Sequence, residues 1–188
     1  DAFSFQQSLY SGIQYQKKQT LPLTILGVSP SYLEFQTIDV KYGRMFNIYD
    51  DNSKSPVAVL GADAAKTLFT NPQDAVGEKI TVLGKKVRVV GIPQELGSIF
   101  GESRDSYVAM PYQTMRKMFG RKGRYQQLQF LVKVRDDLVF EEALDRIIHE
   151  MRILRGLELD EENDFELITE ESLMTTFNNM TAIAFAVM

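Results

Sequence analysis

Apolar and polar positions form their clearest pattern between residues 55 and 93. A short run at 57–60, Val-Ala-Val-Leu, has no polar position, which is typical of a strand buried on both faces. Gly61 ends this run. Apolar residues at helical spacing follow from Ala64 to Phe69, and they predict a helix of about two turns that stops before Asn71-Pro72.

Two β-type runs at 79–82 and 86–92 come next, on either side of Leu83-Gly84-Lys85. This spacing predicts a tight hairpin. Gly77 and Gly91 lie at the ends of runs, where a turn or a close backbone approach suits a residue without a side chain. The whole block therefore predicts ordinary antiparallel packing and carries no catalytic residues.

Weaker patterns predict the other elements before residue 135. We expect a strand at 21–28, a short helix or turn at 30–35, a segment at 40–48 that leads into a turn at 50–53, a glycine-dotted loop at 96–103, a helix at 111–119 and a strand at 128–134. A break at 120–123 is the expected border between two lobes.

The strongest helical pattern runs from residue 138 to 155. Asp136 or Asp137 can cap its start, and Gly156 predicts its end. A strand at 165–168 and a helix from about residue 170 follow. Together these elements predict an α+β fold in two lobes, one α+β lobe from residues 20–37 and 121–178 and an inserted, mainly antiparallel lobe from residues 38–120.

Composition narrows the class of protein. The chain has 188 residues, of which 44% are hydrophobic and 24% charged, so it can bury a substantial core. Its net charge of -4 argues against general nucleic-acid binding. The absence of cysteine excludes disulfides, thiolate catalysis and cysteine-based metal sites.

No residue pattern points to catalysis, a metal or a cofactor. His149 is the only histidine, and with one neighbouring glutamate it does not make a metal site. The carboxylate pairs 50–51, 136–137, 141–142 and 161–162 suit helix caps and solvated turns better than an acid–base dyad. The segment 97–101 lacks the Gly-Lys-Ser/Thr of a phosphate loop. We therefore expect a chain that is not an enzyme.

Charge is distributed unevenly. A basic cluster at 116–124 suits either a solvated helix end or a docking surface for a partner or anionic head groups. Residues 136–171 hold 14 of the 25 carboxylates. Such an excess affects partner choice, and it disfavours contact with anionic lipid.

Several ordered motifs resemble one family. Gly27-Val28-Ser29-Pro30 resembles a GVSPDYF entry motif, Gly43-Arg44 with Phe46 a GRxF turn, and residues 105–111 a D-x-x-[VI]-x-[VI]-P strand. With the block at 56–91 they resemble the periplasmic core domain of MacB-type ABC transporter permeases, over roughly residues 22–175. The matching family-motif residues, all expected to be structural, are Gly27, Pro30, Gly43, Arg44, Val59, Gly61, Phe69, Gly77, Gly91 and Pro111.

The resemblance implies partners and a location. In that family the two lobes are called porter and sabre, and transmembrane helices flank the domain on the extracytoplasmic side of the inner membrane. It implies as partners an ABC ATPase domain or subunit, a second permease copy and a periplasmic adaptor protein, and it implies no cofactor or nucleic acid. Residues 180–188 are uncharged but too few to cross a bilayer, which takes about twenty residues. We therefore expect 179–188 to begin a transmembrane helix, with Met180, Ile183, Phe185 and Val187 entering the membrane.

Two functions follow from these observations. The first is the extracytoplasmic domain of an ABC transporter permease, which couples ATP hydrolysis in the cytoplasm to export or extraction of a substrate. The alternative is a free-standing extracytoplasmic binding or adaptor module that uses a cleft between lobes.

Overall fold

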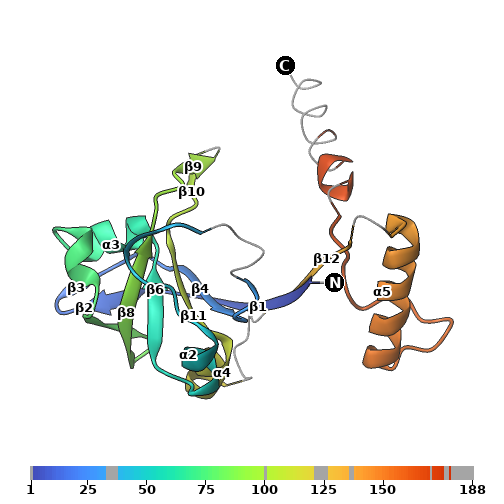
Figure 1. The fold of residues 1–188 in the computed structure, drawn as a ribbon, viewed down its shortest axis with the longest axis horizontal. Coiled ribbons are helices and arrows are strands. Elements are labelled where there is room, and N and C mark those ends of the chain that lie inside the picture. Colours follow the sequence, from blue (N-terminus) through green and yellow to red (C-terminus); the bar gives the residue numbers. More distant parts are fainter. Residues whose placement is uncertain are drawn as a thin grey trace. The chain divides into compact units, whose positions relative to one another are not determined.

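The structure is a computed structural model that describes residues 2–32, 38–99, 101–120, 127–135, 138–169, 171–175 and 178. The chain forms two compact units, residues 1–133 (unit 1) and 134–188 (unit 2). Unit 1 contains the sheet shown in Figure 1, and unit 2 contains one long helix.

Unit 1 is built on a ten-stranded sheet in the order β12-β1-β4-β11-β6-β8-β7-β2-β3, with β5 also paired to β8. Its strands are β1 (Ala2–Ser11), β2 (Ile13–Tyr15), β3 (Lys18–Gln19), β4 (Leu23–Val28), β5 (Val40–Gly43), β6 (Val57–Leu60), β7 (Lys79–Val82), β8 (Lys85–Pro93), β11 (Tyr107–Pro111) and β12 (Gln127–Lys133). Most pairs are antiparallel. The pairs β4–β11 and β6–β8 are parallel, so the antiparallel packing predicted for the whole block at 55–93 is wrong for β6 and β8.

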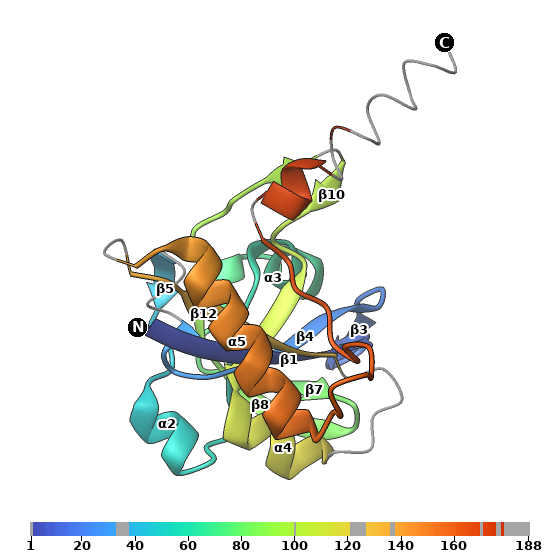
Figure 2. The same ribbon diagram turned by 90° about the vertical axis from the view of Figure 1, so that its right-hand side faces the viewer.

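The sheet curls because β1 and β2, the second and eighth strands in this order, are nearly one strand in the chain. β1 pairs with β12 and β4, whereas β2 pairs with β7 and β3. Only Gly12 separates β1 from β2. The path from β1 through β4, β11, β6, β8 and β7 to β2 therefore returns to its starting point, and the sheet is a curled, barrel-like layer (Figures 1 and 2).

Short helices and a small hairpin complete unit 1. They are α2 (Ile48–Asn52), α3 (Ala62–Leu68), the 3-10 helix η1 (Pro72–Ala75), α4 (Tyr112–Phe119), and the hairpin β9 (Ser98–Ile99) with β10 (Glu102–Ser103). α2 and α4 lie together at one end of the sheet, and the β9–β10 hairpin projects from the other (Figures 1 and 2).

Strand β6 separates two cores, which explains its uninterrupted apolar sequence. Ala58 and Leu60 point into a large core with α3 and α4 side chains, while Val57 and Val59 point into a smaller one around Phe46. The fully buried members of the large core include Ile13, Ile25, Leu60, Leu68, Ile80, Val82, Met110 and Met115. The predicted double-sided burial of 57–60 is confirmed.

Most predicted elements before residue 135 are confirmed, with three exceptions in type or existence. The expected loop at 96–103 contains the β9–β10 hairpin, and the expected turn at 50–53 is largely the helix α2. Strands β1, β2 and β3 were not predicted from residues 1–20. The expected helix at 30–35 lies mostly outside the described residues.

Unit 2 is described by itself. Its helix α5 (Phe140–Arg155) has no fully buried residue and ends at Gly156, whose φ of 70° lies in the left-handed region, as the sequence predicts. Asp136 and Asp137, the predicted caps, lie outside the described residues. Arg152 donates to Asn163 Oδ1 at 2.7 Å and Arg155 Nε to Asp164 Oδ1 at 2.9 Å, so both hold the following loop. The predicted strand at 165–168 is wrong, since these residues form none.

The border between the compact units falls at 133/134, not at the expected lobe borders 37/38 and 120/121. β4 from the first expected lobe pairs with β11 from the second, at Leu26 and Ala109. The division into porter-like and sabre-like lobes stays a prediction. Among the described residues no helix is long and apolar enough to cross a membrane. Met180, Ile183, Phe185 and Val187 lie outside them.

Candidate functional site

Two motif glycines allow two backbone segments to interlock. Gly43 has a φ of 79°, and a Cβ built on it would lie 2.2 Å from the Val90 carbonyl oxygen. A Cβ on Gly91 would lie 2.2 Å from the Arg44 carbonyl oxygen. The Arg44 N–H donates to the Val90 oxygen at 2.9 Å. Only glycine fits at either position, because any side chain would push β8 away from the 43–44 segment.

Arg44 also fixes the start of α2. Its guanidinium donates to both carboxylate oxygens of Asp50, at 2.7 and 3.2 Å, and holds the pKa of Asp50 below its usual value. Asn47 and Asp50 form a reciprocal capping box. Phe46, between them and Arg44, is buried in the smaller core. The GRxF motif therefore anchors α2 on the sheet.

Asp51 links α2 to α4. Its carboxylate accepts the Gln113 N–H at 2.8 Å, in the first turn of α4, directly after the motif residue Pro111. Burial raises the pKa of Asp51, and the hydrogen bond from Gln113 offsets this only in part. The pair 50–51 thus has structural roles, with pKa values shifted in opposite directions for different reasons.

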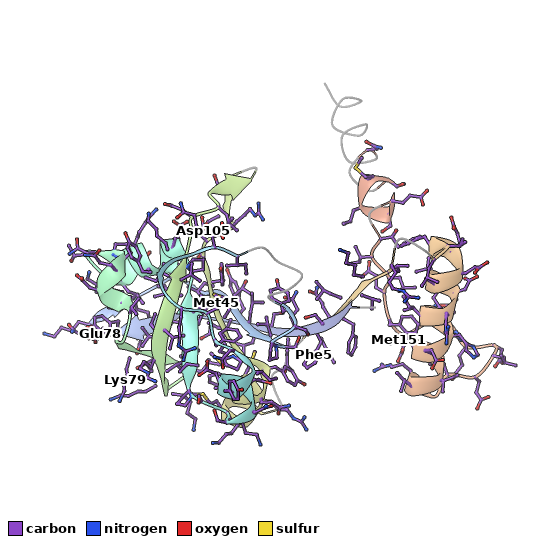
Figure 3. All side chains as sticks on the ribbon, in the orientation of Figure 1. Phe5, Met45, Glu78, Lys79, Asp105 and Met151 are labelled. Carbon is purple, nitrogen blue, oxygen red and sulfur yellow. The ribbon has the colours of Figure 1, made fainter. Side chains whose placement is uncertain are left out.

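Asp105 organises the β9–β10 hairpin. This buried carboxylate accepts the Leu96 N–H on both oxygens at 3.0 Å and the Gly97 N–H at 2.7 Å (Figure 3). A Cβ built on Gly61 would lie only 2.3 Å from the Asp105 carbonyl oxygen. The motif aspartate is therefore a hairpin anchor, and the motif glycine lets the β6–α3 turn approach it.

Asp105 also belongs to a cluster of three carboxylates, with Asp63 and Glu95, whose oxygens lie within 4.8 Å of one another. Lys66 pairs with both Asp63 and Glu95, and the backbone N–H groups satisfy Asp105. The cluster is thus balanced by the protein's own donors and needs no metal ion.

The remaining motif residues support packing. The Phe69 ring lies 4.2 Å from the Tyr15 ring, and Gly77 takes a φ of 94° at the turn before β7. Gly27 faces Met115, whose Sδ would lie 2.3 Å from a Cβ there. Pro30 follows Ser29, whose hydroxyl is hydrogen-bonded to that of the buried Ser4 at 2.8 Å and so ties the end of β4 to β1.

An apolar pocket of about 190 Å³ lies over the face of β4, β11 and β6 that borders the smaller core. It is lined by Leu26, Val28, Tyr32, Ile38, Met45, Val59, Leu96, Arg104, Tyr107 and Ala109. Burial, with the charge of Asp105, raises the pKa of Tyr107 to about 12, and burial also raises that of Tyr32. Two neutral hydroxyls and one guanidinium are its polar groups. The pocket suits an apolar side-chain-sized group, and it is smaller than most ligand sites.

The candidate chemical residues are not brought together within the described part of the chain. His149, Glu141 and Glu142 are exposed on α5, and Glu161 and Glu162 are exposed in the loop after it. Segment 97–101 belongs to the β9–β10 hairpin. No two of these groups form a nucleophile–base or acid–base arrangement.

Comparisons with known proteins agree with this structural role. The family model of the MacB-like periplasmic core domain matches residues 2–150. The macrolide export ATP-binding/permease protein MacB of Salmonella paratyphi A is 26% identical over 155 residues, 82% of this chain and 23% of that protein. The protein of the same name from Escherichia coli strain K12 is 36% identical over 89 residues, 47% of this chain and 14% of that protein.

Solved structures share the fold. The periplasmic region of MacB from Actinobacillus actinomycetemcomitans has a TM-score of 0.76 at 19% identity, over 95% of this chain and 76% of that one. The extracellular domain of the ABC-type transporter YknZ from Gram-positive bacteria has a TM-score of 0.69 at 17% identity, over 83% of this chain and 76% of that one.

The chain spans less than a quarter of the length of the MacB proteins it matches. The family model covers well over half of the chain, and the α+β fold agrees with two solved relatives. The chain therefore belongs to the MacB-like periplasmic core domain family, as an extracytoplasmic, non-enzymatic domain of an ABC transporter permease.

Proposed function

We propose that this domain transmits movement from the membrane part of an ABC transporter to an exported substrate or to a partner protein. The observation that carries the proposal is the interlocked construction of unit 1. One curled sheet is closed on itself through Gly12, and the 43–44 segment is locked against β8 at Gly91. A body that passes on a displacement must not deform internally, and this packing meets that requirement.

The transporter context supplies the remaining parts of the proposal. The relatives are named as fused ATP-binding and permease proteins for macrolide export. We infer that a separate ATPase domain or subunit hydrolyses ATP in the cytoplasm, that the permease forms a dimer, and that a periplasmic adaptor protein completes the path. The domain then lies on the periplasmic side of the inner membrane, and residues 179–188 lead into a transmembrane helix.

The test separates folding from coupling. A six-residue Gly/Ser insertion between Lys133 and Val134, at the border of the two compact units, should leave unit 1 folded and ATP hydrolysis active but abolish export by the full-length transporter. The same insertion at Gly101, in the β9–β10 hairpin, is the control and should preserve export. Export that survives the insertion at 133/134 would refute mechanical transmission.

The apolar pocket favours a second candidate function, a binding module that holds part of the exported molecule. Ala109→Trp would fill the pocket from its β11 wall, while Leu9→Trp would place the same indole side chain outside it. Loss of substrate binding by Ala109→Trp alone, with ATP-coupled movement intact, would favour the binding module over transmission.

A further inference from the structure

One outward face of unit 1 combines apolar and basic side chains. β2 pairs with β3 at Gln14 and Gln19, and with β7 at Ile13 and Val82. The Thr20 N–H donates to the Ile13 carbonyl oxygen at 3.0 Å, so the register continues past β3. It places Leu21 and Leu83 on either side of Gly12, which has no side chain to cover them. They are 85% and 50% exposed.

Basic residues occupy the same face further along the strands. Lys79 lies directly opposite Arg88, and Lys86 lies opposite Thr81. All three cations are exposed, and no described residue forms a hydrogen bond or ion pair with their side chains. Like charges directly opposite each other destabilise a sheet. We name this surface, Leu21, Leu83, Lys79, Lys86 and Arg88, the basic-leucine face.

Two carboxylates beside this face are engaged elsewhere. Glu78, next to Lys79 in Figure 3, accepts a hydrogen bond from the Tyr15 hydroxyl at 2.9 Å. The charge of Arg88 helps to lower the pKa of Asp50, but the Asp50 carboxylate accepts its hydrogen bonds from both terminal nitrogens of Arg44. The face is therefore positively charged with an apolar end.

The hairpin tip adds a conformational observation. Leu83 has a φ of 46°, and Gly84 follows with 75°. Tight hairpins with both central residues at positive φ favour Asn-Gly, because a leucine there is strained. The tip thus presents an exposed apolar side chain at a cost in stability, which contact with a partner would offset.

The chain itself carries a complementary segment in unit 2. Leu159 is fully exposed, and its neighbours Glu158, Asp160, Glu161 and Glu162 are all exposed. Arg152 and Arg155 hold this loop through Glu158 O, Asn163 and Asp164, so its shape is fixed before any partner arrives. Unit 1 has 17 basic against 11 acidic residues, whereas unit 2 has 4 against 14. We name residues 158–162 the acidic-leucine loop.

We propose that the basic-leucine face of one copy binds the acidic-leucine loop of a second copy. Leu159 would pack against Leu21 and Leu83 while its flanking carboxylates meet Lys79, Lys86 and Arg88. Each copy offers one face and one loop, so two copies related by a two-fold axis would make this contact twice. The contact is small and charged, so it is weak and salt-dependent. It rests on the dimer of the proposed function and names the surfaces that would join the two copies, and its test makes no use of transport.

The chain has no cysteine, which makes the test direct. Leu83→Cys and Leu159→Cys are made in separate copies, mixed and oxidised. The heterodisulfide is expected to exceed that of a Tyr49→Cys and Leu159→Cys mixture by about tenfold. Tyr49 is a matched control, because it is 79% exposed and lies on α2, outside the face. Equal yields in the two mixtures overturn the proposal.

A charge exchange supplies the second measurement. Lys79→Glu with Arg88→Glu, added to the Leu83→Cys copy, should reduce the heterodisulfide to the control level. Glu161→Lys with Glu162→Lys in the Leu159→Cys copy should then restore it. Lack of either effect, in variants whose circular dichroism shows the native fold, contradicts the pairing. A disulfide that closes only when both cysteines are in one chain also overturns the intermolecular contact.

Discussion

Asp105 gives the sharpest prediction about stability, because one buried carboxylate holds a whole hairpin. Asp105→Ala removes the acceptor of the Leu96 and Gly97 N–H groups. A donor left without a partner costs about 1–3 kcal/mol when buried. Both residues are exposed, so water reaches these N–H groups in part. The lower end of this range, about 1 kcal/mol for each of the two N–H groups, therefore applies. We expect a loss of about 2 kcal/mol in the free energy of unfolding.

Thermal unfolding followed by circular dichroism measures this loss. For a chain of this size, 2 kcal/mol corresponds to a fall in Tm of about 4–8 °C. Hydrogen exchange should be faster at the Leu96 and Gly97 amides. The amides of β6 and β8 should lose only as much protection as the fall in global stability requires. Asp105→Asn keeps one acceptor oxygen, so its loss should be about half as large.

Glu95→Gln is the matched control, because it removes a carboxylate from the same cluster that contacts only the exposed Lys66. Its effect should stay within about 0.5 kcal/mol. An unchanged Tm for Asp105→Ala, or equal shifts for Asp105→Ala and Glu95→Gln, would refute the anchoring role of Asp105.

Three other predictions follow from the packing and the titrations. Gly91→Ala should lower the Tm more than Asp105→Ala, since its Cβ would lie 2.2 Å from the Arg44 oxygen; an unchanged melt contradicts the interlock. Asp50 has a depressed pKa and so stabilises above its ordinary value of 3.8, whereas burial raises the pKa of Asp51 and its charge costs stability at neutral pH. Asp50→Asn should therefore destabilise the protein at pH 7, and its loss of stability should shrink as the pH falls below 3.8. Asp51→Asn should match or exceed the native stability in urea unfolding. An Asp51→Asn variant less stable than Asp50→Asn at pH 7 would contradict these assignments. The pKa of Tyr107 is raised from 10.0 to about 12, so the native fold loses stability as the pH rises above 10.0. Tyr107→Phe should move alkaline unfolding to higher pH and remove the tyrosine that titrates near pH 12 in ultraviolet absorbance.

Local sequence patterns were sufficient to predict a segment when its pairing partners are close in sequence or when all of its side chains are buried. The run at 57–60 and the hairpin at 79–92 were predictable because four consecutive buried residues and a two-strand alternation leave few alternatives. The helix ending at Gly156 was predictable from spacing and its stop signal. The missed helix α2 did leave a signal, since Asn47 and Asp50 have the spacing of a capping box.

β1 could not be predicted in this way. Half of its sequence, AFSFQQSLYS, is polar, and the buried Ser4 is satisfied by the Ser29 hydroxyl. One of its two pairing partners is distant, with Ser8 opposite Gln127. The same holds for the candidate site. The pocket gathers side chains from residues 26 to 109, and the basic-leucine face depends on the register across the four strands β3, β2, β7 and β8, which the sequence does not display.

The continuity of β1 and β2 through Gly12 has a consequence during biosynthesis. Residues 2–15 leave the ribosome well before residues 127–133, and one edge of their strand waits for β12, whose last residue is Lys133. At ordinary elongation rates this takes on the order of 6 to 25 s. Throughout that interval a long strand with unsatisfied backbone groups is available to other chains, so β1 stays exposed to aggregation until β12 has been made.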